Sequence, residues 1–138
     1  MISVRLLFSA AMLLVSSLAY AGAFKIAPVT IFDYGETGNA GGNLIAARFS
    51  DNDYERIGCA VASGDKGPYA YCEASLDADD DGGVYCITYD ASMINAIASI
   101  NTLSYVYFEW KFDGVDRNLC THVTVATRSI HIPAKLKP

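Results

Sequence analysis

Alternating apolar and polar positions predict a mainly β protein. Three segments of strand length, "RIGCAVAS", "PYAYCEASLD" and "GGVYCITYD", follow one another with turn-forming residues between them. Because successive side chains of a strand point to opposite faces, Cys59, Cys72 and Cys86 fall on a face of small residues. We expect an antiparallel meander of three strands, with hairpin tips at residues 63–67 and 77–81.

The flanking segments add further strands to this pattern. Residues 23–34 are rich in branched and aromatic side chains and contain Pro28, which suggests a strand at a sheet edge. The glycine-rich run from Gly35 to Asn43 predicts a flexible loop, and "NLIAARFS" a second strand. Residues 104–114 alternate most clearly and predict another strand, with a last strand or two after them.

One segment changes its period from two to between three and four. After Asp90, a plausible N-cap, the residues Met93, Ile97 and Ile100 form one apolar helical stripe. A helix at about 90–100 should cover part of the sheet. The expected fold is therefore an antiparallel sheet or β-sandwich with one packed α-helix.

The first 21 residues have the order of a secretory signal peptide: Arg5, an apolar run, and a small-x-small site ending at Ala21. We expect residues 22–138 to form a single exported domain, periplasmic or secreted, in a Gram-negative bacterium. No later segment reaches the roughly 18 consecutive apolar residues of a membrane span, so none is expected in the mature form.

Four cysteines in an exported chain predict two disulfides. Neighbouring strands lie about 4.8 Å apart, so a bridge from Cys59 to Cys86 across the middle strand would exceed the roughly 7 Å limit on the Cα separation. Two pairings remain open: Cys59–Cys72 with Cys86–Cys120, and Cys72–Cys86 with Cys59–Cys120. The first is preferred. The cysteine spacings do not suit structural zinc.

Composition and motifs argue against several functions. The chain carries 10 Lys and Arg against 15 Asp and Glu, without the basic cluster that nucleic-acid binding needs. No cofactor motif or nucleophile motif occurs. His122 follows Cys120 by two residues and should share its strand face, which could mimic a Cys-His pair, but we prefer the interpretation of an oxidised Cys120 beside a satisfied or exposed histidine. Glu73 could pair with a loop aspartate. We regard a small hydrolase using these groups as the alternative to a non-enzymatic protein.

The loop "SLDADDDGG" resembles the start of a calcium loop, with Asp77, Asp79 and Asp81 at alternate positions. The position that needs a bidentate glutamate falls on Thr88, and strands rather than helices flank the loop. We interpret it as a solvated hairpin tip, with weak calcium binding as the alternative.

The outward face of the second and third meander strands is rich in tyrosine. Its aromatic residues are Tyr69, Tyr71, Tyr85 and Tyr89. Amphipathic aromatic side chains are enriched where proteins bind partners. We hypothesise a contact surface for another protein or a glycan. The competing interpretation is that the helix or a second sheet covers this face.

The segments "GGNLIAARFSDNDYERIGCAV", "AYCEA", "VYCITYD", "SYVYFEW" and "LCTHVTV" together resemble a group of small exported bacterial proteins with four cysteines and no established activity. The matching positions are Ala47, Arg48, Ser50, Ile57, Gly58 and the four cysteines. The resemblance implies export and a disulfide-bonded domain, and it implies no catalytic residues. The expected function is a non-enzymatic binding or structural module that uses the tyrosine face or the Gly35 to Asn43 loop, such as an inhibitor or immunity-type protein.

Overall fold

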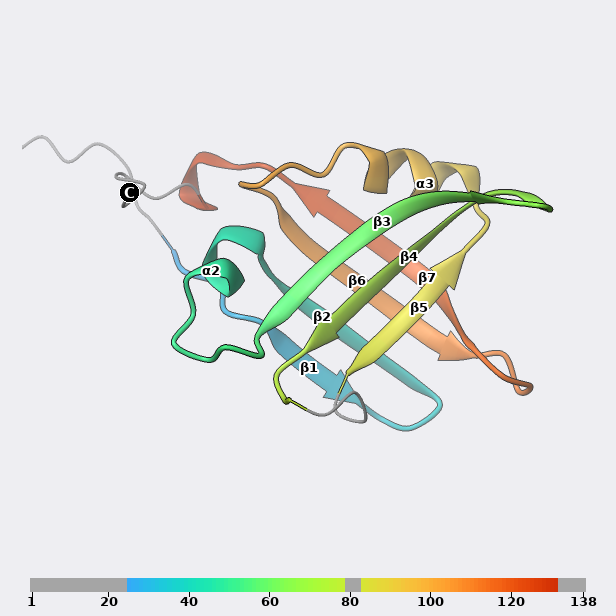
Figure 1. The fold of residues 1–138 in the computed structure, drawn as a ribbon, viewed down its shortest axis with the longest axis horizontal. Helices are drawn as coiled ribbons and strands as arrows, with labels where there is room; N and C mark the ends of the chain where they lie inside the picture. Colours follow the sequence, from blue (N-terminus) through green and yellow to red (C-terminus); the bar gives the residue numbers. More distant parts are fainter. Residues whose placement is uncertain (1–24, 79–82, 132–138) are drawn as a thin grey trace, which may run out of the picture.

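The computed structural model describes residues 25–78 and 83–131, which form a mainly β fold (Figure 1). Its elements are β1 (Thr30–Asp33), β2 (Thr37–Asn43), α2 (Leu44–Arg48), β3 (Arg56–Gly64), β4 (Gly67–Ser75), β5 (Val84–Thr88), α3 (Ala91–Ala98), β6 (Tyr105–Phe112), β7 (Asn118–Ala126) and a 3-10 turn, Ser129–His131. The strands make one sheet in the order β1-β2-β6-β7-β5-β4-β3. The neighbouring strands are antiparallel except β5 and β7, so the sheet is mixed.

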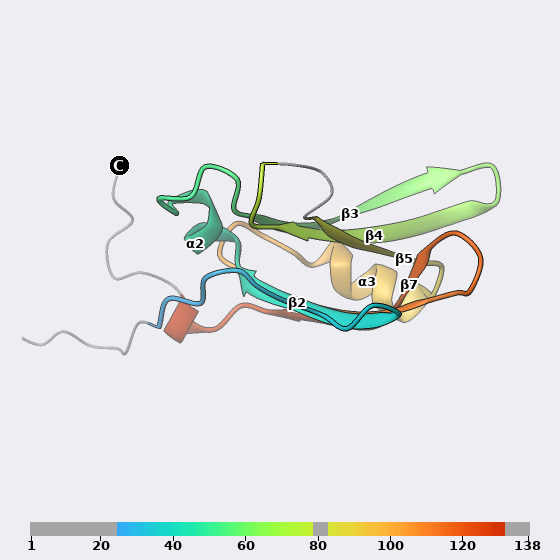
Figure 2. The same ribbon diagram turned by 90° about the horizontal axis from the view of Figure 1, so that it is seen from below.

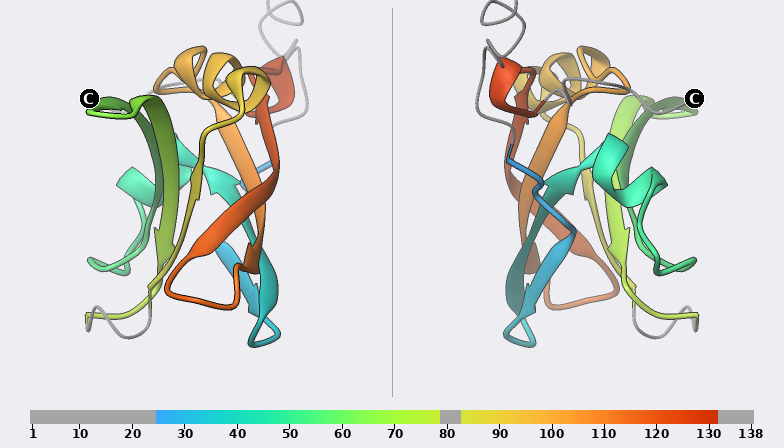
Figure 3. Two further views of the ribbon diagram at one scale, coloured as in Figure 1. Left: turned by 90° about the vertical axis from the view of Figure 1, so that its right-hand side faces the viewer. Right: turned by 90° about the vertical axis from the view of Figure 1, so that its left-hand side faces the viewer.

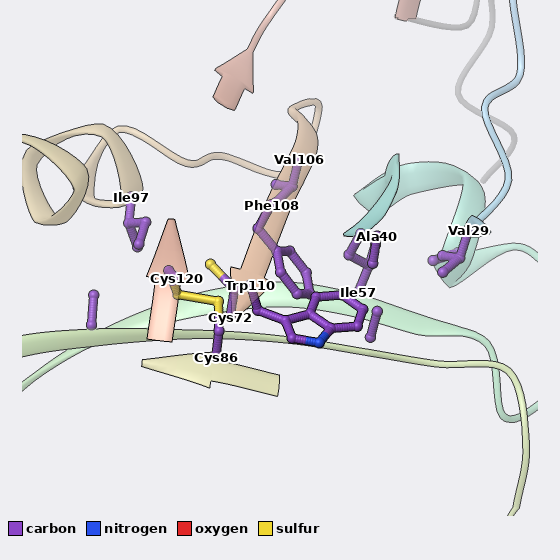
Figure 4. Close-up of a cluster of buried hydrophobic side chains, with 13 residues drawn as sticks. Val29, Ala40, Ile57, Cys72, Cys86, Ile97, Val106, Phe108, Trp110 and Cys120 are labelled. Carbon is purple, nitrogen blue, oxygen red and sulfur yellow. A yellow bond between two sulfur atoms is a disulfide. The ribbon is translucent and has the colours of Figure 1, made fainter. Parts of the chain in front are cut away.

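The sheet bends into two facing layers. Figure 2 shows β3, β4 and β5 in one layer and β2 in the other, and Figure 3 shows α3 across one end of the space between them. The core fills this space, with the Phe108 and Trp110 rings beside the Cys86–Cys120 disulfide (Figure 4). Ile97 of α3 belongs to the same core. The helix therefore closes one end of the core.

The structure confirms several predictions. β3, β4 and β5 form the antiparallel meander, β1 lies at a sheet edge, and α3 begins after Asp90, whose carboxylate accepts the backbone N–H groups of Ser92 and Met93. The preferred disulfide pairing is also present. Cys59 pairs with Cys72 and Cys86 with Cys120, at Cα separations of 4.0 Å and 5.0 Å.

The strand expected over residues 43–50 was wrong, because this segment contains helix α2. Its five residues, "LIAAR", are mostly strong helix formers, and the helix buries Ile45 and Ala47. A short apolar run does not distinguish a strand from a buried helix. Here the chain must cross from β2 in one layer to β3 in the other, and the helix makes that crossing.

The flexible loop expected from Gly35 to Asn43 was also wrong, since most of it is strand β2, paired with both β1 and β6. Its glycines make room for the aromatic residues of β6. A Cβ at Gly38 would lie 2.2 Å from Cζ2 of Trp110, and one at Gly41 would lie 2.6 Å from the Tyr105 hydroxyl. Aromatic rings thus lie over glycine on both faces of β2.

Candidate functional site

The outward face of β4 and β5 carries an open groove of about 500 Å³. Alternation along each strand turns Cys72 and Cys86 into the core and the tyrosines outward. The residues that give the groove its chemistry are Tyr69, Tyr71, Tyr85, Glu73, Arg56 and Arg117. Three of the four predicted binding tyrosines therefore meet at one site.

The aromatic side chains of this groove remain accessible. Tyr71 is 39% exposed and Tyr85 is 49% exposed. Cross-strand register places Glu73 opposite Tyr85, and Tyr71 opposite Ile87. Tyr89 is exposed but does not line the groove; its ring centroid lies 6.2 Å from that of Tyr69.

Because α3 closes one end of the core and the second layer lies on the inner side of β4 and β5, neither covers the tyrosines among the described residues. The interpretation that a packed element covers this face was wrong for Tyr71 and Tyr85. Within the part of the chain that the structure describes, both rings therefore keep surface that a partner can contact.

One wall of the groove comes from the connection between β6 and β7, which sequence reasoning missed. Arg117 donates two hydrogen bonds to the Asp116 carboxylate, at 2.9 and 3.2 Å, and these bonds raise the pKa of its guanidinium. Asp113 accepts the backbone N–H of Val115, which holds the pKa of Asp113 below its usual value and orders the turn. In the sequence, one signal indicated that this connection lies near the groove: the possible Cys86–Cys120 disulfide, which joins β5 to β7.

The expectation that His122 shares a strand face with Cys120 was wrong, whereas the preferred interpretation of an oxidised Cys120 beside a separate histidine is confirmed. A β-bulge in β7 places Cys120 opposite Trp110 and His122 opposite Glu109, which leaves Thr121 as an extra residue. Cys120 therefore points into the core, where it is oxidised, and His122 lies on the exposed outer face. Its Nε2 atom lies 2.9 Å from Oγ1 of Thr124. No Cys-His nucleophile can form.

A second polar cluster surrounds His122 on the outside of β6 and β7. The Tyr107 hydroxyl donates a 2.7 Å hydrogen bond to Oε1 of Glu109, and the Tyr107 and His122 ring centroids are 6.2 Å apart. The bond to Glu109 raises the pKa of Tyr107 to about 12, with burial adding to the effect. A phenol held neutral in this way is a hydrogen-bond donor rather than a nucleophile.

The raised pKa of Tyr107 predicts a late titration. Its ordinary value is 10.0, so the protonated form is favoured by folding, and this contribution to stability is complete below about pH 10 and is lost as the pH rises through about 12. Tyrosinate absorbance of the parent minus that of Tyr107→Phe should show one group titrating near pH 12. Glu109→Gln should move that titration toward the ordinary value. Identical curves for parent and Glu109→Gln would contradict the assigned cause.

The carboxylates offer little support for metal or acid-base chemistry. Asp77 is exposed, while Asp79 and Asp81 lie outside the described residues, so the calcium interpretation stays a prediction. Within the described residues no group of three His, Cys, Asp or Glu side chains could hold a metal ion. Glu73 and Asp116 both line the groove, but Asp116 is bound to Arg117.

Two broader observations complete the site. No helix in the described part of the chain is long and apolar enough to cross a membrane. Comparison of the chain with protein-family models, with curated proteins and with solved structures finds no match. The family resemblance drawn from the sequence therefore stays a prediction.

Proposed function

We propose that the protein is an exported, non-enzymatic binding module whose tyrosine groove takes up a partner. The observation that carries this proposal is the uncovered pair Tyr71 and Tyr85 in a groove with both acidic and basic side chains. Tyrosine supplies a large apolar ring and a polar tip at a low entropic cost, which suits a contact surface. An inhibitor or immunity-type protein is one form of this function.

Export and oxidation are consistent with this function. The two disulfides suit an oxidising compartment such as the periplasm or the medium. They also tie β3 to β4 and β5 to β7, and so fix the strands that present the groove. A pre-organised surface loses less entropy on binding than a mobile one.

The hydrolase alternative has less support than the binding module. It named His122 or unrecognised carboxylates, and the bulge in β7 places His122 on the other strand face from Cys120. Glu73 faces the groove, but the other described carboxylate there is held by an arginine. No observation favours a second candidate function.

We expect that Tyr71→Ala with Tyr85→Ala abolishes partner capture. Tagged protein with intact disulfides would be exposed to periplasmic extract and culture medium of the producing organism. Each buried aromatic contact contributes about 2 kcal/mol when it is a hot spot, so each change should weaken binding about thirtyfold.

The matched control replaces two exposed tyrosines outside the groove, Tyr34 and Tyr54, by alanine. This variant should retain the partner fully. A partner that binds the groove variant as well as the parent, or that is lost equally by both variants, would refute the proposed site.

A further inference from the structure

Strand β3 is an unusually open sheet edge beside the tyrosine groove. It is the last strand of the sheet and nine residues long, whereas β1 at the opposite edge has only four. Proteins usually protect long edges with lysine, proline or a bulge. β3 contains neither residue, and its register with β4 is continuous from Arg56 to Gly64.

The disulfide geometry shows which backbone groups point outward from this edge. Directly opposite residues in an antiparallel pair lie about 4.5 Å apart where they do not hydrogen-bond and about 5.5 Å apart where they do. Cys59 and Cys72 are directly opposite, with a Cα separation of 4.0 Å. The N–H and C=O of Cys59 therefore point away from β4, and so do those of Val61 and Ser63.

These groups lack partners in the described part of the chain. No backbone hydrogen bond links Cys59, Val61 or Ser63 to another element, and no side chain there bonds to them. Val61 is 45% exposed, and the β3–β4 hairpin extends beyond the rest of the sheet (Figure 1). A row of free donors and acceptors is thus available to another strand.

We propose that the partner of this module is an extended peptide segment that adds to β3 as an antiparallel strand and places alternate side chains over the tyrosine groove. This inference rests on the proposed function and names the class of its partner. In such complexes the main chain provides affinity and alternate side chains provide specificity.

The side chains of β3 that face the groove are small enough for this arrangement. Ala60 lies opposite Tyr71, and Ala62 opposite Tyr69. Because a strand added to β3 lies about 4.8 Å away, an apolar side chain opposite Ala60 or Ala62 can reach over the methyl group to the tyrosine ring. Larger residues in β3 would block this contact.

The Glu73 carboxylate favours a basic side chain at the next outward-facing position of the peptide. Gly58 lies opposite Glu73, and a Cβ at Gly58 would meet no atom within 4 Å. A lysine or arginine opposite Gly58 can therefore extend over the glycine toward the Glu73 carboxylate. The net charge of −5 on the chain also favours a cationic segment.

Together these positions define the recognised segment. Because the peptide runs antiparallel to β3, its residues face Ala62 first, then Ala60 and then Gly58. The order along the peptide is therefore apolar-x-apolar-x-basic.

A displayed library of random twelve-residue peptides, selected on the parent protein, tests this inference. The selected peptides should share the apolar-x-apolar-x-basic order. Methylation of their backbone nitrogens should abolish binding at every second position, where the N–H bonds to β3. On a Glu73→Lys protein, the basic preference should become acidic.

Val61→Pro isolates the strand addition from the tyrosine contact. It removes an N–H that points away from β4, so the sheet pairing should survive. We expect peptide affinity to fall at least about tenfold, while Val61→Ala changes it less than about threefold. Unchanged melting temperatures would confirm that both variants fold.

Three results would overturn the strand addition: selected peptides without alternation, equal affinity for Val61→Pro, or no enriched peptide. A natural partner, such as a glycan, could bind the Val61→Pro variant but not the variant with Tyr71→Ala and Tyr85→Ala. That result would leave the proposed groove function intact and refute only the inference about the peptide. Loss in both variants supports both proposals.

Discussion

Replacing Gly38 with alanine is expected to lower the free energy of unfolding by about 3 kcal/mol, the upper part of the range for overpacking a core. The added Cβ would lie 2.2 Å from Cζ2 of Trp110 and 2.5 Å from the backbone oxygen of Phe32. Trp110 is buried and packs on Phe108, so its ring has little room to move. Strand β2 would have to separate from β1 or β6.

Gly58→Ala is the matched control for this change. Gly58 also lies in a strand, but an added Cβ there meets no atom within 4 Å, and its backbone is not in the left-handed region. The control should be neutral or more stable by about 0.5 kcal/mol, since alanine reduces the entropy of the unfolded chain. Urea denaturation followed by the fluorescence of Trp110, the one tryptophan, measures both variants.

A second change identifies the cause of the Gly38→Ala effect. Trp110→Phe removes the ring atom that the new methyl group would strike. The two changes together should therefore cost less than the sum of their separate effects, with a coupling of about 1 kcal/mol or more. Because the Trp110→Phe variants contain no tryptophan, urea denaturation of all members of this cycle is followed by circular dichroism. Additive costs would show that the Trp110 ring is not what excludes a side chain at Gly38.

These glycines illustrate what sequence reasoning could not reach. Glycine in a strand weakens it, and clusters of glycine and asparagine usually mark a loop, so the local pattern predicts flexibility from Gly35 to Asn43. The reason for the strand lies in β6, more than sixty residues later, whose Trp110 and Tyr105 rings cover Gly38 and Gly41. Only the pairing of β2 with β6 brings these residues together.

The tyrosine groove was accessible to prediction where it depends on local alternation. Tyr69, Tyr71 and Tyr85 lie outward because Cys72 and Cys86 lie inward, and period two is preserved along β4 and β5. The same argument failed at His122, since one extra residue at Thr121 reverses the faces of β7. Sequence reasoning missed Arg117 because no local pattern indicates that β5 and β7 are neighbours in the sheet.

The second large effect concerns the junction between β5 and β7. Replacing Cys86 and Cys120 together by alanine should lower the free energy of unfolding by about 4 kcal/mol, because their bridge closes a loop with a separation of 34 residues. The same change at Cys59 and Cys72, with a separation of 13, should cost about 3 kcal/mol. Urea denaturation of the two variants measures the difference.

The position of each bridge predicts a further contrast. β5 and β7 are joined in the sheet by one residue pair, Ile87 with Leu119, whereas Cys59 and Cys72 lie within nine paired residues of β3 and β4. Without the Cys86–Cys120 bridge, the sheet should open first between β5 and β7. Hydrogen exchange should then rise in both strands while β3 and β4 stay protected. Equal protection of β5 and β7 in parent and variant would show that core packing alone holds this junction.

Separation of β5 from β7 would also change the shape of the groove. Tyr85 belongs to β5, and Arg117 precedes β7, so separation of the two strands would move one wall of the groove away from the other. Partner binding should therefore weaken in the Cys86→Ala, Cys120→Ala variant under conditions where it remains folded. The Cys59→Ala, Cys72→Ala variant should retain binding better, because the nine-residue pairing still holds β3 against β4.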